Sequence, residues 1–263
     1  MKSSNPVLAQ LAGRSQQHAS FRPGPGAGYP TAPSYQGYAG TSADRMTIDD
    51  VVVRAVTLLA VVGATGALAW TLLADSQYAG GYLLGAAIGG LVLGLIISFA
   101  RVTNPVVLLT YAAIEGVFVG LASAFFDARY HGIVVQAAAS TFAIFIGMAV
   151  LYKFKVLRAT PTFVKWVSGA IIGCFALMLV NFGLSFFVSG GIGIRSGGPV
   201  AIIFSLVCIG VAAFSFILDF AAIENGVSAG IDRKFAWYAA FGIIVGLIWL
   251  YLEILRLLGY ARR

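Results

Sequence analysis

Residues 105–126 read PVVLLTYAAIEGVFVGLASAFF, an apolar run in which Glu115 is the only charged residue. A transmembrane helix needs about 20 predominantly apolar residues, and this run has that length. The run therefore predicts a membrane-spanning helix that carries a carboxyl group near its middle. An ionised side chain at such a depth is costly, so the acid raises the question of which group it faces.

The composition of the whole chain is that of a membrane protein. Hydrophobic residues make up 59% of the 263 residues and charged residues only 10%, whereas soluble domains carry about 25% charged residues. Seven apolar segments follow one another, at about 51–73, 81–100, 105–126, 132–152, 163–188, 199–222 and 235–258. We therefore predict an all-α membrane protein, a seven-transmembrane-helix bundle formed by residues 46–263.

The first 45 residues differ from the rest of the chain. Residues 21–44 are rich in Gly, Pro, Ser, Thr and Tyr, a mixture that cannot bury enough apolar surface to fold alone. We expect residues 1–45 to be a disordered, Gly/Pro-rich cytoplasmic tail. The helical domain should begin at Thr47, whose hydroxyl group can cap a helix with Asp49 and Asp50 in its first turn.

The basic residues predict the orientation of the bundle. They are spread over the tail and several loops, which argues against a nucleic-acid-binding face. If the amino terminus is cytoplasmic, nine basic residues from Arg45 onward lie inside and five outside, as the positive-inside rule requires. The nine are Arg45, Arg54, Arg101, Lys153, Lys155, Arg158, Lys165, Arg233 and Lys234, and the five are Arg129, Arg195, Arg256, Arg262 and Arg263. We therefore predict a cytoplasmic amino terminus and a carboxyl terminus outside.

No pattern in the chain indicates an enzyme or a cofactor. Residues 226–230, GVSAG, match the G-x-S-x-G motif of serine hydrolases, but the two histidines, His18 and His131, both precede it and would lie in the tail and in a loop across the membrane. A nucleophile elbow also needs a preceding strand, and none is predicted there. Cys174 and Cys208 lie in apolar runs, which is typical of buried small residues rather than of a metal site.

Three acids lie within the apolar sequence, namely Glu115, Asp219 and Glu253. Intramembrane acids usually face a partner or a water-filled cavity, and they mark ion or proton pathways. Each also has a simpler interpretation. Glu253 could pair with Arg256 at i,i+3 near the outer surface, and Asp219 could be an interfacial residue at a helix end. Glu115 could be a protonated carboxyl group bonded to Tyr111 one turn away or to a backbone carbonyl group.

Three short segments resemble a known family. They are IEGVFVG (114–120), ILDFAAIE (217–224) and LYLEILRLL (250–258). They are similar to the glutamate-bearing third helix, the aspartate-bearing end of the sixth helix and the seventh-helix signature of the transmembrane Bax inhibitor motif family, which includes the bacterial YccA-like proteins. The resemblance covers residues 50–260 in topology and implies a bacterial member with an extended amino-terminal tail.

This resemblance implies a pair of gate acids, Asp219 and Glu253, that would bind calcium transiently at the centre of the bundle. Arg101 and Arg256 would be latch or counter-ion residues, and Glu115 with Tyr111 a pathway or proton relay. If the turn between the last two helices is centred near Arg233, Asp219 and Glu253 differ in depth by about 9 Å at 1.5 Å per residue. Two carboxyl groups that share a site without water cannot easily both ionise, so protons would control their charge.

The resulting function is an expectation with two alternatives. We expect a multi-pass protein of the plasma (inner) membrane that forms a pH-sensitive cation leak, with calcium as the transported ion. The first alternative is a regulator without transport activity, which binds a membrane protease or another membrane protein through its tail. The second is a proton-coupled transporter of a small solute. The sequence predicts contact with the lipid bilayer and leaves the oligomeric state open.

Overall fold

The computed structural model describes residues 45–185, 187–188 and 191–262. The tail predicted for residues 1–45 therefore lies outside the described residues, apart from Arg45. Every regular element in the described part is a helix: α2 (Ile48–Leu73), α3 (Ala79–Ala100), α4 (Pro105–Asp127), α5 (Ile133–Lys153), α6 (Pro161–Ser185), α7 (Pro199–Ser228) and α8 (Phe235–Ala261). All seven are long and apolar enough to span a membrane. The chain is a multi-pass membrane protein, and the predicted seven-helix bundle is confirmed.

The first helix begins where the sequence predicts. The Thr47 hydroxyl group accepts a hydrogen bond from the Asp50 amide (3.1 Å), and Asp50 Oδ2 accepts one from the Thr47 amide (3.2 Å). This reciprocal arrangement is a capping box, which satisfies amide groups that the first turn leaves without a helical partner. Helix α4 begins in a similar way, because Asn104 Oδ1 accepts a hydrogen bond from the Val106 amide (2.9 Å) and Pro105 follows the cap.

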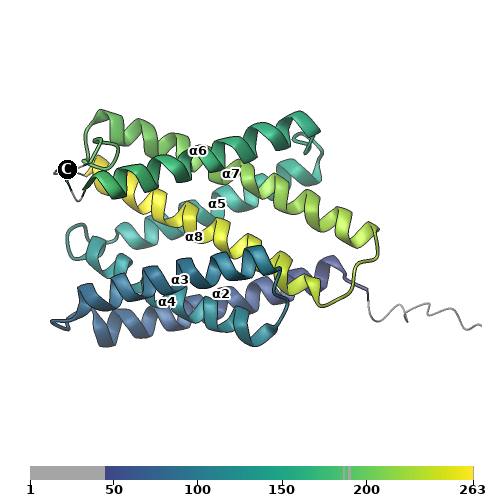
Figure 1. Cartoon of the computed structure of the whole chain (residues 1–263), viewed down its shortest axis with the longest axis horizontal. Coiled ribbons are helices and arrows are strands. Elements are labelled where there is room, and N and C mark those ends of the chain that lie inside the picture. Colours follow the sequence, from purple (N-terminus) through teal and green to yellow (C-terminus); the bar gives the residue numbers. More distant parts are fainter. Residues whose placement is uncertain (1–44, 186, 189–190, 263) are drawn as a thin grey trace, which may run out of the picture. The chain divides into compact units, whose positions relative to one another are not determined.

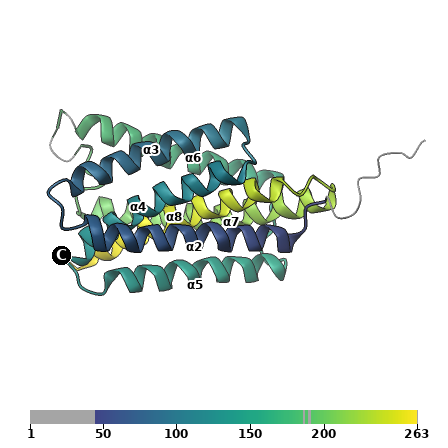
Figure 2. The ribbon, with the colours of Figure 1, turned by 90° about the horizontal axis from the view of Figure 1, so that it is seen from below.

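Helix α8 lies at the centre of the bundle. It packs against α2, α4, α5 and α7, whereas the main neighbour of α3 is α4 and that of α6 is α7. Figure 1 shows α6 and α7 on one side of α8 and α2, α3 and α4 on the other, and Figure 2 shows α5 on a further side. The large apolar side chains of α3 and α6 are accordingly exposed, among them Phe99 and Trp166, as expected of helices that face lipid.

The helices alternate in direction, so the bundle has two chemically different ends. We call the basic end the one at which α2 and α8 begin, and the C-terminal end the one at which α8 ends (Figure 1). Nine of the basic residues from Arg45 onward lie toward the basic end, and the four other described ones lie toward the C-terminal end. The predicted orientation, with the basic end in the cytoplasm, depends on this unequal distribution of basic residues.

The closest contact between helices joins α2 and α4. A Cβ atom added to Gly116 would lie 2.6 Å from the Val62 carbonyl oxygen, and one added to Gly120 would collide with the backbone of Gly66. Small residues four apart on α4 therefore let the two backbones touch, as expected in a membrane where helix packing depends on close approach. By contrast, the spaced glycines Gly169 and Gly173 on α6 have open space beside them.

The first part of one predicted loop is in fact helical. We expected the sixth span to end near residue 222 and ENGVSAGIDRK (224–234) to form a loop, but α7 continues to Ser228. Contacts with neighbouring segments stabilise this extension. The Tyr152 phenol of α5 donates a hydrogen bond to Glu224, and a Cβ atom on Gly226 would lie 2.8 Å from the Met46 side chain.

Candidate functional site

Glu253 is a buried carboxyl group held by two arginines. Its side chain is 2% exposed, and its Oε1 atom lies 2.8 Å from Arg256 Nη1 and 3.3 Å from Arg195 Nη2. The other oxygen, Oε2, is buried and has no hydrogen-bond partner among the residues that the structure describes. The pairing of Glu253 with Arg256, which the sequence left as one interpretation, is present, and the carboxylate is only half satisfied.

Arg195 reaches this site because the loop between α6 and α7 folds back onto the bundle. Asn181 of α6 accepts a hydrogen bond from the Ile192 amide through Oδ1 (3.0 Å), and the Ile194 side chain is buried. The Tyr260 hydroxyl group then donates a hydrogen bond to the Arg195 carbonyl oxygen (3.2 Å). The loop is thus held just before Arg195 and at Arg195 itself. Burial and the nearby Arg256 charge lower the pKa of Arg195.

Asp219 lies in a different environment. Its Oδ1 atom would lie 3.5 Å from a Cβ atom on Gly242, so the carboxyl group rests against the bare backbone of α8. The hydrogen bonds and ion pairs of the described residues include none to Asp219. Asp219 lies in the half of α7 nearer the basic end, but it is not at the helix end, because nine residues follow it before α7 ends at Ser228.

The structure does not bring the two gate acids together. Gly242, which faces Asp219, precedes Glu253 by eleven residues on α8. At 1.5 Å per residue, the two carboxyl groups differ in depth by about 16 Å. Calcium–oxygen distances are about 2.3–2.6 Å, so one ion cannot contact both acids in this arrangement. The proposed shared calcium site of Asp219 and Glu253 is therefore not formed in this structure.

The expected offset of about 9 Å was too small because the turn was misplaced. We centred it near Arg233, but the register of the two helices is centred near Ile231. Phe216 confirms this register, because its ring would lie 2.9 Å from a Cβ atom on Gly246. When the centre of the turn moves by one residue, each residue of α7 faces an α8 residue two positions away from its former partner. A small error in the turn therefore became a large error in depth.

Glu115 and Tyr111 lie together on α4, against two glycines of α3. A Cβ atom on Gly90 would lie 2.6 Å from Glu115 Oε1, and one on Gly94 would lie 3.2 Å from the Tyr111 ring. The Tyr111 phenol is a hydrogen-bonding neighbour of the Glu115 carboxyl group. The Tyr111 ring also contacts Phe241 of α8, with ring centroids 4.9 Å apart.

The acids therefore occupy two levels along α8. Asp219 and the Tyr111 ring lie at the level of the adjacent residues Gly242 and Phe241. Glu115 lies one turn further along α4, and Glu253 lies about three turns beyond Gly242. Glu115 is thus nearer in depth to Asp219 than Glu253 is. Asp219 and Glu115 are thus similar in depth but lie against different helices, α8 and α3, while Glu253 lies with its two arginines.

Arg101 does not serve as the latch of these acids in this structure. It is the exposed C-cap of α3, in a left-handed conformation with φ of 48°, and its helix packs mainly on α4 at the edge of the bundle. The arginine that the sequence did not single out is Arg195. Its only signal was that it is the one charged residue in the glycine-rich stretch SGGIGIRSGGP.

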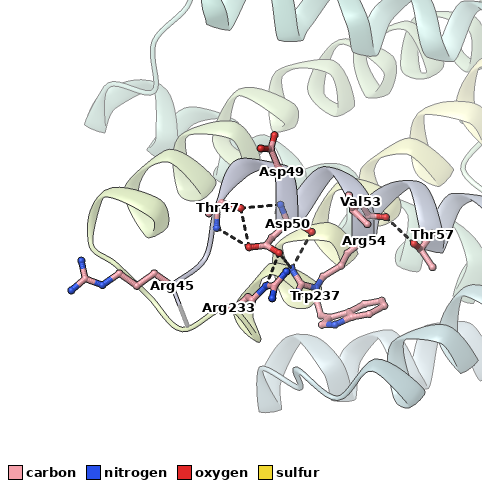
Figure 3. Close-up of a pocket in the computed structure, with 9 residues that line it drawn as sticks. All are labelled: Arg45, Thr47, Asp49, Asp50, Val53, Arg54, Thr57, Arg233 and Trp237. Atoms are coloured by element: carbon pink, nitrogen blue, oxygen red, sulfur yellow. Dashed lines mark hydrogen bonds and ion pairs between the residues drawn. The ribbon is translucent and has the colours of Figure 1, made fainter. Parts of the chain in front are cut away.

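A second arginine-bound acid lies at the basic end. Asp50 Oδ1 is 2.7 Å from Arg233 Nε and 3.3 Å from Arg54 Nη1, while its Oδ2 atom accepts hydrogen bonds from the Thr47 amide and hydroxyl groups. These residues line an open pocket of about 620 Å³, in which Asp49 points away from the arginines (Figure 3). Both oxygens of Asp50 are satisfied, so this cluster joins the start of α2 to the α7–α8 connection.

The described residues offer no resident metal site. They contain no group of three or more His, Cys, Asp or Glu side chains that could hold an ion. Cys174 and Cys208 are buried free thiols, as predicted. The chemistry available inside the bundle is therefore that of separate carboxyl groups, one with arginine partners and two without a basic partner.

Comparison with known proteins agrees with the resemblance of the three segments. A search of curated proteins found no match. The family model described as Bax inhibitor 1 like matches residues 5–263, nearly the whole chain. This match includes all seven helices and each of the three acids within them. The chain belongs to the Bax inhibitor 1 like family.

Proposed function

We propose that the protein is a pH-sensitive cation leak channel of the plasma membrane, with calcium as a transported ion and intramembrane carboxyl groups as its gate. Membership of the Bax inhibitor 1 like family supports this proposal, because the resemblance implies such a leak. The proposal involves no cofactor and no enzymatic step. It differs from the sequence-based expectation in one respect, since Asp219 and Glu253 act at separate levels rather than as one pair.

The observation that carries the proposal is the state of Glu253. Its carboxylate is almost fully buried, one oxygen is shared by two arginines, and the other has no partner among the described residues. Buried carboxylates with a purely structural role usually have hydrogen bonds to both oxygens. A half-satisfied carboxylate beside two partly exposed guanidinium groups instead favours a group that exchanges partners.

The two arginines would form the closed state of the gate. Arg195 and Arg256 line a pocket at the C-terminal end, and their guanidinium groups lie at Glu253 Oε1. A cation that approaches from this end meets two positive charges before it meets the carboxylate, and like charges at short range repel strongly where water is scarce. Conduction would therefore require at least one arginine to leave Glu253.

Protons would act on Asp219 and Glu115, which lie nearer the basic end than Glu253 does. Asp219 has no ion pair among the described residues, and the neighbour of Glu115 is the uncharged Tyr111 phenol. An ionised carboxyl group away from water is costly unless a proton or a cation neutralises it. Protons and cations then compete for Asp219 and Glu115. Flux should fall as the pH is lowered, because protonated carboxyl groups no longer attract cations.

Calcium flux into liposomes across pH 6 to 8 tests the proposal. We expect the wild type to conduct more at pH 8 than at pH 6, and Asp219→Asn and Glu115→Gln to lower the flux several-fold and to flatten its pH profile. Asp49→Asn is the matched control, because Asp49 is an exposed acid outside both levels, and its flux should equal that of the wild type. An absence of flux, or a flux that neither Asp219→Asn nor Glu115→Gln changes, would refute the channel.

The same assay separates the alternative of a regulator that works through its tail. Removal of residues 1–44 should leave the flux intact if the helices form the pathway. If a partner contact through the tail were the function, the deletion would abolish the biological activity of a protein that shows no flux. A proton-coupled transporter would instead acidify the liposome interior in step with uptake of its solute.

A further inference from the structure

A pocket of about 310 Å³ opens at the C-terminal end of the bundle. It lies between the ends of α4 and α8 and the loop that precedes α7. Its walls combine three guanidinium groups with aromatic rings and one glycine. The lining residues are Phe125, Phe126, Arg129, Tyr130, Arg195, Arg256, Gly259 and Tyr260.

Positive charge exceeds negative charge in this pocket. Arg195 and Arg256 share one carboxylate oxygen of Glu253, and Arg129 makes no ion pair with any acid that the structure describes. The nearest acid in sequence, Asp127, accepts a hydrogen bond from the Gly132 amide through Oδ1 (3.0 Å). Among the described residues, the lining thus contains three guanidinium groups and no acid, and the buried Glu253 carboxylate behind two of them leaves an excess of two positive charges.

The guanidinium groups of Arg195 and Arg256 lie close enough for their charges to repel each other. The Arg195 side chain is 27% exposed and that of Arg256 is 23% exposed, so water screens their charges only in part. Burial and the Arg256 charge lower the pKa of Arg195, which lies in the loop outside the spans. A bound anion would relieve this repulsion, whereas a cation would increase it.

The walls of the pocket have the composition of a membrane interface. Arg129 lies over the Phe125 ring, at 5.9 Å from its centroid, and the Phe125 side chain is itself 61% exposed on the outer surface of α4. Tyr130 and Tyr260 add rings with polar tips near the points where α4 and α8 end. Aromatic residues of this kind collect at the level of lipid headgroups. We therefore expect the pocket to lie at headgroup level, next to the exposed Phe125 side of α4.

We propose that this pocket binds the phosphate group of an anionic phospholipid, with the acyl chains along the exposed face of α4 at Phe125. Guanidinium groups bind phosphate oxygens in bidentate geometry, and several together select a group with net negative charge. A volume of about 310 Å³ exceeds that of a phosphate alone and accommodates a glycerol headgroup. The site shares Arg195 and Arg256 with the proposed gate, but its test measures lipid binding and not flux.

The test titrates the purified full-length protein in detergent with three probes: dioctanoyl phosphatidylglycerol, dioctanoyl phosphatidylcholine and inorganic phosphate. Native mass spectrometry counts bound lipid, and the midpoint of thermal unfolding reports all three ligands. We expect phosphatidylglycerol to bind at least about tenfold more tightly than phosphatidylcholine. Equal affinity for the two lipids would overturn the proposal.

Arg129→Gln is the decisive variant, because Arg129 is exposed and has no acid partner whose loss would unfold the protein. It should remove most of the preference for phosphatidylglycerol, and Arg129→Lys should retain part of it. Arg262→Gln is the matched control, since Arg262 lies at the same end but bonds His131 and Gln136 outside the pocket. A preference that survives Arg129→Gln unchanged, or that Arg262→Gln removes equally, contradicts the site. Competition by inorganic phosphate at millimolar concentration would identify free phosphate rather than lipid as the source of the anion.

Discussion

Two acids in this protein have nearly the same partners and very different surroundings. Asp50 at the basic end and Glu253 toward the C-terminal end each pair with one arginine of their own helix and one from a loop. Asp50 is 11% exposed and uses its second oxygen to cap α2. Glu253 is 2% exposed, and its second oxygen has no partner among the described residues.

The difference separates a structural ion pair from a candidate gate. A carboxylate whose oxygens are all bonded gains nothing from a further ligand, so Asp50 holds α2 against the α7–α8 connection. A buried carboxylate with a free oxygen keeps the capacity to bind a proton or a cation. The number of arginine partners does not distinguish the two acids, because each has two; the state of the second carboxylate oxygen does.

The largest effect on stability is expected from Glu253→Gln. The change leaves the Arg195 and Arg256 charges without their carboxylate, and breaking a buried pair from one side typically costs about 3–5 kcal/mol. Because both arginines keep some exposure, we expect a loss of about 2–3 kcal/mol in the free energy of unfolding. Unfolding in mixed detergent micelles measures it, and a loss below that of Asp50→Asn would reverse the comparison.

Asp50→Asn should have a smaller effect. The Arg233 side chain is 58% exposed, so water replaces much of the lost interaction, and the asparagine can still accept from Thr47. We expect a loss of about 1 kcal/mol. Asp49→Asn is the control in the same turn, because Asp49 points away from the arginines (Figure 3). Equal losses for Asp49→Asn and Asp50→Asn would show that the arginine contacts contribute nothing.

Thr47→Ala should cost the least and should affect the basic end alone. It removes the hydroxyl group that accepts from the Asp50 amide, and such a substitution typically costs about 0.5–1 kcal/mol in a partly exposed cap. Hydrogen exchange should rise in the first turn of α2 and stay unchanged near Glu253. Faster exchange at both ends would mean that the two clusters are coupled rather than separate.

Much of the fold followed from local sequence. The seven spans, the start of the first helix at Thr47 and the proximity of Glu253 to Arg256 all depend on residues close together in the chain. Local signals of this kind suffice because apolar length and capping are set within a few turns. The predicted end of α7 was wrong. The helix continues past Gly226, which packs against Met46, a residue far away in sequence.

The site was less predictable because it depends on register and on a folded loop. A turn misplaced by about two residues changed the separation of Asp219 and Glu253 from about 9 Å to about 16 Å. Arg195 reaches Glu253 because the Ile192 amide donates a hydrogen bond to the Asn181 side chain, and no spacing in the sequence encodes that contact. Acids within apolar runs could be recognised, but their partners could not.

The most direct test of the account is the calcium flux of Arg195→Gln in liposomes at pH 7.5. Arg195 is the basic partner of Glu253 that comes from a loop, so its removal should weaken the closed state while Arg256 keeps the carboxylate charged. The account predicts a flux several-fold above that of the wild type, which an added Asp219→Asn lowers again. A flux equal to or below the wild-type value would contradict the claim that the two arginines on Glu253 hold the pathway closed.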